Sequence, residues 1–197
     1  MELEELNSFR LVGGTSLSLQ IGHRMSVDID LFTDAVYDSI DFNRIDEIIS
    51  STFQLVDMGY GGNNSMGKSY YVGTSKDDLV KLDIFYTDPF IYPKITMEGV
   101  RFAGLEEIAA MKLEVIGNGG RKKDFWDLHE LLEHYSLAQM ITFYEKRYPY
   151  SFSKEEIIAR LTFFENANED FDPICLRKKY WELIKLDFEE RVKKEFN

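Results

Sequence analysis

The chain has 197 residues, 44% hydrophobic and 14% aromatic, enough for one sizeable packed core and too apolar for disorder. Its net charge of −12 argues against a broad nucleic-acid-binding surface, although the basic clusters at 121–123 and 177–179 could contact a polyanion locally if they are not simple helix-surface charges. The sequence shows no membrane-length apolar run and no signal peptide, and Cys175 is its one cysteine. We therefore expect a cytoplasmic protein with no membrane contact.

The first hundred residues carry mixed helix and strand patterns. A short helix is expected from Thr15 to Ile21, and strict alternation predicts a strand over 26–33, with Val27, Ile29 and Leu31 on its buried face. The other predicted elements are a helix over 42–50 with Asp41 as N-cap, strands over 53–58, 69–73 and 79–86, and a hairpin over 95–103 that turns at Glu98 and Gly99.

Beyond Gly104 the patterns are helical. Amphipathic spacing predicts helices over 105–116, 122–135, 137–147 and 176–196, and a capping box at 153–156 begins a further one. The predicted fold class is therefore α+β: a mixed β-sheet lobe with flanking helices over residues 1–104, followed by a helical lobe over 105–197.

Residues 11–32, LVGGTSLSLQIGHRMSVDIDLF, place two aspartates one residue apart. In a strand Asp28 and Asp30 would share a face, and two such carboxylates suit Mg²⁺ or Mn²⁺, which prefer oxygen ligands. An exposed acidic strand face is the more ordinary interpretation of that pattern taken alone.

The residues upstream of these aspartates favour a ligand site. Gly13 and Gly14 allow close approach of a ligand to the backbone, while Thr15 and Ser16 stand at the first turn of a helix, where free N–H groups favour a phosphate. Together the two halves indicate a nucleoside triphosphate and metal site, with a tight turn and hydroxyl caps as the alternative.

A third carboxylate, Asp83, lies in the strand predicted over 79–86. If this strand pairs beside the first, Asp83 can face Asp28 and Asp30, as in polymerase-like sites where the third carboxylate can also accept a proton. Alternation alone does not establish this triad, because Lys81 and Phe85 share the face of Asp83.

A competing motif, GNNSMGKS at 62–69, matches the P-loop pattern letter for letter. A P-loop requires a helix after its lysine, whereas Lys68 is followed by SYYVG, a strand pattern. We interpret residues 59–69 as a glycine-rich hairpin loop.

Two motifs carry a family resemblance. Residues 13–15 (Gly-Gly-Thr) and 24–32 (RMSVDIDLF) resemble the first motif of the nucleotidyltransferase superfamily, in the version of the AbiEii/AbiGii-type toxin family. The later signature of that family, a lysine-bearing helix and then Arg-x-Lys-Asp-x-x-Asp-Leu, is similar to AAMKLEVI with Lys112 and to RKKDFWDL at 121–128.

The resemblance implies a nucleotidyltransferase-like fold in which the helical lobe completes the cleft. By position it implies Mg²⁺ or Mn²⁺ ligation and catalysis by Asp28, Asp30 and Asp83, with Lys112 and Asp124 as further catalytic residues. The nucleotide-binding residues that it implies are Gly13, Gly14, Thr15, Ser16, Ser26, Lys112 and Lys123, and Asp127 is expected to support the fold.

The implied activity is metal-dependent transfer of an NMP from an NTP to an acceptor hydroxyl, with release of pyrophosphate. The acceptor would be an RNA, the tRNA 3′ end included, or a protein. The resemblance also implies the toxin of a toxin–antitoxin or phage-defence pair, with a cognate antitoxin as partner. The alternatives are a catalytically inactive binding or regulatory protein on the same fold, a phosphatase with Asp28 as nucleophile, and a P-loop NTPase that depends on Lys68.

Overall fold

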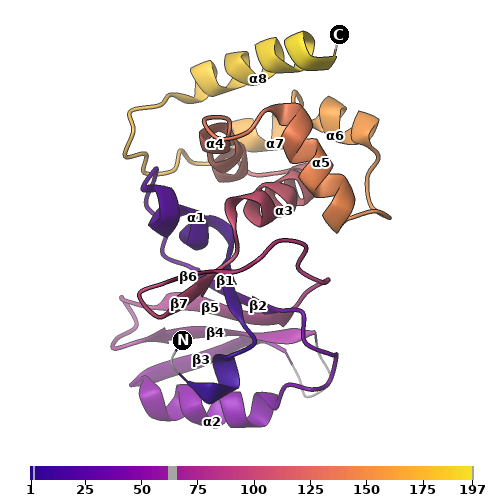
Figure 1. Ribbon diagram of the computed structural model, residues 1–197. Coiled ribbons are helices and arrows are strands. Elements are labelled where there is room, and N and C mark those ends of the chain that lie inside the picture. The colour runs from indigo at the N-terminus through magenta and orange to yellow at the C-terminus, as the bar shows by residue number, and fades with distance from the viewer. Residues whose placement is uncertain (2, 62–65, 197) are drawn as a thin grey trace. The chain divides into compact units, whose positions relative to one another are not determined.

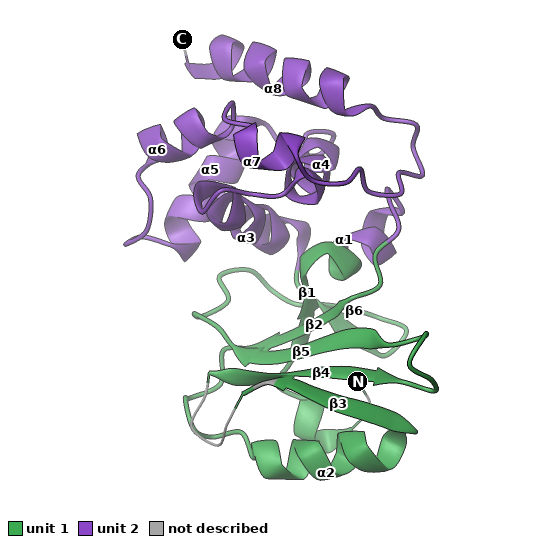
Figure 2. Ribbon diagram, turned by 180° about the vertical axis from the view of Figure 1, so that it is seen from behind, with its two compact units in different colours: residues 1–16, 26–103 green, residues 17–25, 104–197 purple. Residues whose placement is uncertain are grey.

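The computed structural model describes residue 1, residues 3–61 and residues 66–196, and the chain forms two compact units. The first contains residues 1–16 and 26–103, and the second contains residues 17–25 and 104–197 (Figure 2). The chain crosses from the first unit to the second inside helix α1 (Gly13–Ile21). None of the described helices is long and apolar enough to span a membrane.

The first unit is built on a mixed seven-stranded sheet in the order β3-β4-β5-β2-β1-β7-β6 (Figure 1). The pairs β2/β5 and β1/β7 are parallel, and the other neighbours are antiparallel. The strands are β1 (Arg10–Val12), β2 (Ile29–Thr33), β3 (Leu55–Tyr60), β4 (Gly67–Gly73), β5 (Val80–Tyr86), β6 (Ile95–Met97) and β7 (Val100–Phe102), and a 3₁₀ turn (Glu4–Leu6) precedes them.

Helix α2 (Phe42–Thr52) covers one face of this sheet. Asp41 caps the helix as predicted, since its side chain accepts hydrogen bonds from the first backbone amides. The buried side chains of α2 join those of the central strands in one apolar cluster that includes Ile45, Ile49, Leu31 and Ile84. Burial of these side chains fixes which residues of each strand face α2 and which face the opposite side.

The start of the first predicted strand is wrong. Strand β2 begins at Ile29, and Val27, expected on the buried face, is 65% exposed. The reason is the short neighbour: β1 ends at Val12, opposite Asp30, where the chain turns into α1. Residues 26–28 therefore have no partner in β1, and the alternation that they continue in sequence is not strand structure.

The other predicted strands are confirmed to within three residues at each end. The hairpin β6/β7 turns at Glu98 and Gly99 as expected, with φ of +49° and +77°. Two consecutive positive φ angles match the twist of a tight hairpin, and glycine adopts the second without strain. Strand β1 was not predicted, because three residues are too few to show a period.

The second unit is helical, as predicted. Its elements are α3 (Leu105–Gly117), α4 (Lys122–Leu131), α5 (Leu137–Arg147), α6 (Lys154–Arg160), α7 (Glu165–Asn168) and α8 (Trp181–Phe196). The Ser153 capping box begins α6 as expected, whereas α7 was not foreseen and α8 begins five residues later than predicted. Phe125 of α4 packs edge-to-face against Phe164, Trp181 and Phe188, which anchors α8 to α4.

Candidate active site

Asp30 and Asp83 lie side by side on the sheet face opposite α2. Strands β2 and β5 are parallel neighbours, and these two aspartates are register partners. The residues after them, Leu31 and Ile84, are buried in the cluster under α2, so both carboxylates point the other way. The condition on which the third carboxylate depended is therefore met: the two strands pair, and the pairing brings two of the three predicted acidic residues together.

Lys81 shares this face and was not among the predicted site residues. Its Nζ lies 2.5 Å from Oδ2 of Asp83. The hydrogen bond to Asp83 raises the pKa of Lys81 above its ordinary value against the opposing effect of burial, and the charge of Asp30 adds to the increase. The signal in the sequence was its position two residues before Asp83 on one strand.

The donor chemistry here suits a hard divalent cation. Oδ1 of Asp83 is buried and has no hydrogen-bond partner among the described residues, and an unsatisfied carboxylate oxygen of this kind is one that a bound cation would satisfy. Asp28 precedes β2, and the described residues contain no group of three Asp, Glu, His or Cys side chains gathered to hold a metal ion. The structure thus pairs Asp30 with Asp83 but does not gather Asp28 with them into a ligand set.

Gly13 begins α1 two residues before the predicted start and fits closely against Asp30. Its φ is +68°, and a Cβ at this position would lie 2.5 Å from Oδ2 of Asp30. Both facts require glycine. The backbone at the start of α1 therefore lies against the carboxylate, with Gly14 as the next residue of the helix.

Thr15 ties the start of α1 to the segment before β2. Its hydroxyl donates to the backbone carbonyl of Asp28 and lies 2.9 Å from Oγ of Ser26. Because a carbonyl only accepts and Thr15 has one hydroxyl hydrogen, Ser26 is the donor in the second bond. Thr15 and Ser26 thus lie together, while Ser16 is fully buried.

Lys112 belongs to a buried ion cluster in the second unit. Its side chain is 8% exposed, and Nζ lies 2.7 Å from both Oδ1 of Asp124 and Oδ2 of Asp127. Burial alone would lower the pKa of Lys112, but the charges of Asp127 and Asp124 outweigh it and raise that pKa. Lys112 therefore stays charged, and both carboxylates neutralise it.

Asp127 is the centre of this cluster. Arg24 approaches it with both Nε and Nη2, at 2.6 and 2.8 Å, and Nε2 of His23 lies 2.7 Å away. Burial would raise the pKa of Asp127, yet Lys112, Arg24 and His23 together lower it well below its usual value. The arginine of the first motif thus binds the last aspartate of the second, a contact that the sequence did not reveal.

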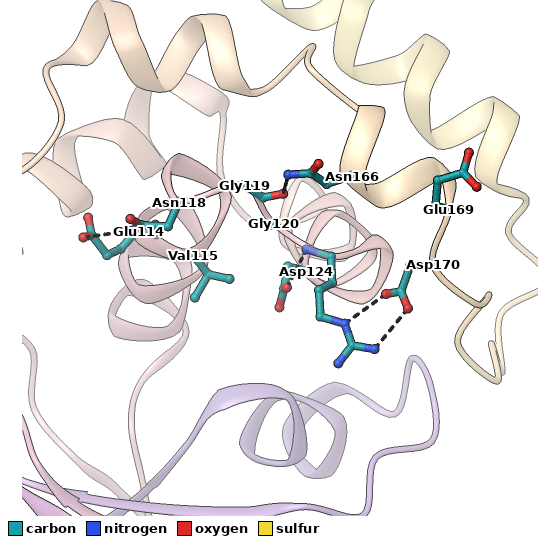
Figure 3. Close-up of a pocket in the computed structure, with 10 residues that line it drawn as sticks. Glu114, Val115, Asn118, Gly119, Gly120, Asp124, Asn166, Glu169 and Asp170 are labelled. Atoms are coloured by element: carbon teal, nitrogen blue, oxygen red, sulfur yellow. Dashed lines mark hydrogen bonds and ion pairs between the residues drawn. The ribbon is translucent and has the colours of Figure 1, made fainter.

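Asp124 also caps its own helix, since its Oδ2 accepts a hydrogen bond from the backbone N–H of Arg121 at 3.0 Å. Lys123, the next predicted nucleotide contact, is partly exposed. Asp124 borders a cavity of about 620 Å³ between the ends of α3, α4 and α7 (Figure 3). Across its rim Arg121 binds Asp170 through two hydrogen bonds, of 3.0 and 3.1 Å, and this pairing lowers the pKa of Asp170.

Lys68 lies in β4, with no helix after it, and it points to the side of the sheet that α2 covers. It pairs with Asp46 of α2 at 2.5 Å and is 4% exposed. Residues 62–65 of the P-loop-like motif lie outside the described residues. Residues 67–69 of the motif are strand, so the loop predicted over 59–69 is shorter than expected, since β3 ends at Tyr60 and β4 begins at Gly67. The lysine of the motif has a structural partner.

The basic clusters are largely neutralised within the second unit. Arg121 pairs with Asp170 and Lys122 with Asp172. Arg177 and Lys179 both bind Glu130 and Glu133. These pairs favour the interpretation of both clusters as structural charge.

Known proteins resemble the chain over almost its full length. Residues 2–194 match the family model described as "Nucleotidyl transferase AbiEii toxin, Type IV TA system". The uncharacterized protein aq_aa25 of Aquifex aeolicus (strain VF5) is 30% identical over 202 residues, which covers 95% of this chain and 87% of that protein.

Two solved structures show the same fold. One, from H. pylori and provisionally described as a nucleotidyltransferase, has a TM-score of 0.62 at 21% identity, covering 95% of this chain and 85% of that one. The nucleotidyltransferase toxin MenT4 of Mycobacterium tuberculosis H37Rv has a TM-score of 0.61 at 13% identity, covering 95% and 76%. With a family model that matches nearly its whole length, this chain belongs to the AbiEii nucleotidyltransferase toxin family and is a nucleotidyltransferase.

Proposed function

We propose that the protein transfers an NMP from an NTP to an acceptor hydroxyl in a reaction that depends on Mg²⁺ or Mn²⁺. The observation that carries this proposal is the register pairing of Asp30 with Asp83, directly beside Gly13 at the start of α1. A carboxylate pair with an unsatisfied oxygen and the N-terminus of a nine-residue helix are the two parts that a metal-bound triphosphate needs.

Asp30 and Asp83 would hold the cation, which when bound neutralises charge on the triphosphate. Asp28 is added by the family motif and would have to move toward this pair to bind the same ion. The backbone at Gly13 and Gly14 would bind and orient the phosphates. Thr15 and Ser26 would join it by turning their hydroxyl hydrogens from their present acceptors to a phosphate oxygen, and the buried Ser16 would support the turn. Asp83 would also accept the proton of the attacking hydroxyl. The acceptor oxygen forms the new bond to the α-phosphorus, and pyrophosphate leaves.

Lys112, Lys123 and Asp124 enter this proposal from the family motif. Lys112 keeps its positive charge, which suits a phosphate contact and stabilisation of the leaving pyrophosphate. It is held by two carboxylates, so we propose that it acts with Asp124 as a unit and not as a lone cation.

The acceptor that we propose is an RNA, the tRNA 3′ end included, with a protein hydroxyl as the second candidate. We further propose that the protein is the toxin of a toxin–antitoxin or phage-defence pair and that a cognate antitoxin binds it. The description of the family as a type IV toxin–antitoxin system supports this role.

A label-transfer assay tests the proposal. The protein is incubated with Mg²⁺, each of the four α-labelled NTPs in turn, and either total RNA or total cell protein. Wild type is compared with Asp30→Ala and with two controls, Asp34→Ala and Lys68→Ala. Asp34 is an exposed carboxylate just beyond the other end of β2, and Lys68 faces α2.

Asp30→Ala should reduce label transfer at least about a hundredfold, because it removes a proposed metal ligand. Both controls should retain transfer per folded molecule. Phosphate release that depends on Lys68 would contradict the proposal in favour of a P-loop NTPase. Nucleotide binding without any transfer to either acceptor pool would favour a binding or regulatory protein.

A further inference from the structure

Lys81 places a positive charge beside Asp83 on the acidic face of the sheet in the first unit. It lies two residues before Asp83 on β5, and Tyr71 is its register partner on β4. Neither the family motifs nor the proposed reaction assigns it a role. Its side chain is 38% exposed, whereas that of Asp83 is 16% exposed, so the ammonium reaches the carboxylate from the solvent side.

The two oxygens of Asp83 have different environments. Oδ2 is held by Nζ of Lys81 at 2.5 Å. Oδ1 is buried and has no hydrogen-bond partner in the part of the chain that the structure describes. Oδ1 is therefore unsatisfied but enclosed in this structure, and Oδ2 is available to a new ligand only when Lys81 leaves or shares it.

The charges explain why a lysine belongs there. Asp30 and Asp83 are neighbours on adjacent strands, about 5 Å apart in backbone spacing, and like charges at this range repel. Nζ of Lys81, 2.5 Å from Oδ2 of Asp83, partly balances this repulsion. One ammonium and two carboxylates leave a net charge of about −1, a weaker attraction for a divalent ion than the bare pair has.

We propose that Lys81 is the built-in counter-ion of the Asp30–Asp83 pair and competes with the divalent cation for Asp83, which keeps the metal affinity of the nucleotide-free protein low. This inference rests on the proposed metal-dependent function. The flexible four-carbon stem lets the ammonium move from the carboxylate to an anionic oxygen. A bound triphosphate supplies such oxygens, so nucleotide and metal would reinforce each other's binding.

Direct metal binding without nucleotide tests this role separately from catalysis. Mn²⁺ is titrated into the full chain, and the free ion is followed by its electron paramagnetic resonance signal. The variants are Lys81→Met and Lys81→Gln, which remove the charge, and Lys81→Arg, which keeps it. The matched control is Lys94→Met, an exposed lysine before the far edge strand β6, four strands from β5. Circular dichroism in EDTA checks that each variant is folded.

Both neutral variants at position 81 should bind Mn²⁺ about tenfold more tightly than wild type. They lack the positive charge of Lys81, which repels a divalent ion at short range in a largely aqueous site. The Mn²⁺ affinities of Lys81→Arg and Lys94→Met should stay within about threefold of the wild-type affinity. Unchanged or weaker Mn²⁺ binding by both Lys81→Met and Lys81→Gln would overturn the inference.

Asp83→Asn separates failure of this inference from failure of the proposed function. If this variant loses Mn²⁺ binding while Lys81→Met binds like wild type, the metal site stands and the counter-ion role falls. If wild type, Lys81→Met and Asp83→Asn all fail to bind Mn²⁺ at millimolar concentration, both the metal-dependent function and the counter-ion role are contradicted.

Discussion

Substitution of Asp127 by asparagine tests the buried ion cluster of the second unit most directly. Asp127 is fully buried and binds three partners, Lys112, Arg24 and His23. Asparagine has nearly the same size and keeps one oxygen acceptor, so the variant removes the charge with little change in packing. The expected effect is on the stability of the second unit, to which all four residues belong.

The magnitude follows from what the variant leaves behind. Lys112 keeps Asp124 as a partner, but Arg24, 5% exposed, loses both of its hydrogen bonds to a carboxylate. Removal of one partner from a buried ion pair typically costs about 3–5 kcal/mol, a large fraction of the free energy of unfolding of a small domain. The matched control is Asp187→Asn, whose side chain is 44% exposed beside His129, and a cost of about 0–1 kcal/mol is expected there.

Urea unfolding followed by tryptophan fluorescence measures this effect. Both tryptophans of the chain, Trp126 and Trp181, are buried in the second unit, so their emission reports on that unit. If Asp127→Asn lowers the free energy of unfolding by less than 1 kcal/mol, or by no more than Asp187→Asn, the reasoning about the buried cluster is refuted.

The pH dependence of the same difference gives a second check. The pKa of Asp127 is lower in the folded protein than in the unfolded chain. Its contribution to stability is therefore fully present above its ordinary pKa of about 4 and is lost as pH falls toward the folded value. The pKa of Lys112 is raised, so its contribution is present below about 10.5 and is lost at higher pH. The gap between wild type and Asp127→Asn should thus be constant near neutral pH and shrink below pH 4.

Three further predictions concern single positions. Gly13→Ala should weaken Mn²⁺ binding at least about tenfold, because the added Cβ would displace the carboxylate of Asp30. The control Gly22→Ala has a similar φ of +64° and nothing within 4 Å of the added Cβ, so it should only lose about 1–2 kcal/mol of stability in urea unfolding. Equal Mn²⁺ binding by both variants would contradict the reasoning. Lys68→Met should lower the free energy of unfolding by about 1–3 kcal/mol, because it leaves Asp46 without its partner. It should leave Mn²⁺ binding unchanged, because Lys68 lies on the α2 side of the sheet, and weaker Mn²⁺ binding would contradict that placement. Burial and the charge of a nearby lysine lower the pKa of His129, so wild type should lose stability as pH falls below about 6.5, and His129→Gln should show a smaller loss between pH 7.5 and 5.5.

Local pattern predicted the elements that carry the acidic face. Alternation over 26–33 and 79–86 identified β2 and β5, and the pairing of these strands brings Asp30 beside Asp83. The start of β2 could not be predicted, because it depends on where its short neighbour β1 ends. Strand order and register are set by packing against α2, which no local period records.

Side-chain partners were the less predictable part of the candidate site. A lysine on a helix pattern looks the same whether it faces water or a carboxylate, so the pairing of Lys112 with both Asp124 and Asp127 was not predicted. Arg24 and Asp127 are 103 residues apart in the chain, so only the packing of the second unit brings them together. The contact of Lys81 with Asp83 was within reach of sequence reasoning, since both residues share one strand face.

The bond between Arg24 and Asp127 also constrains how the second unit can fold. Residues 17–25 leave the ribosome well before residue 104, yet they belong to the same compact unit as the helices that follow it. The strands from β2 to β7 are synthesised between these segments. Arg24 and His23 therefore stay solvated, without the carboxylate of Asp127, until α4 has been synthesised. The second unit is thus completed only when residues 17–25 pack against helices that follow residue 104. Because these contacts are distant in sequence, we expect the second unit to fold slowly and after the first.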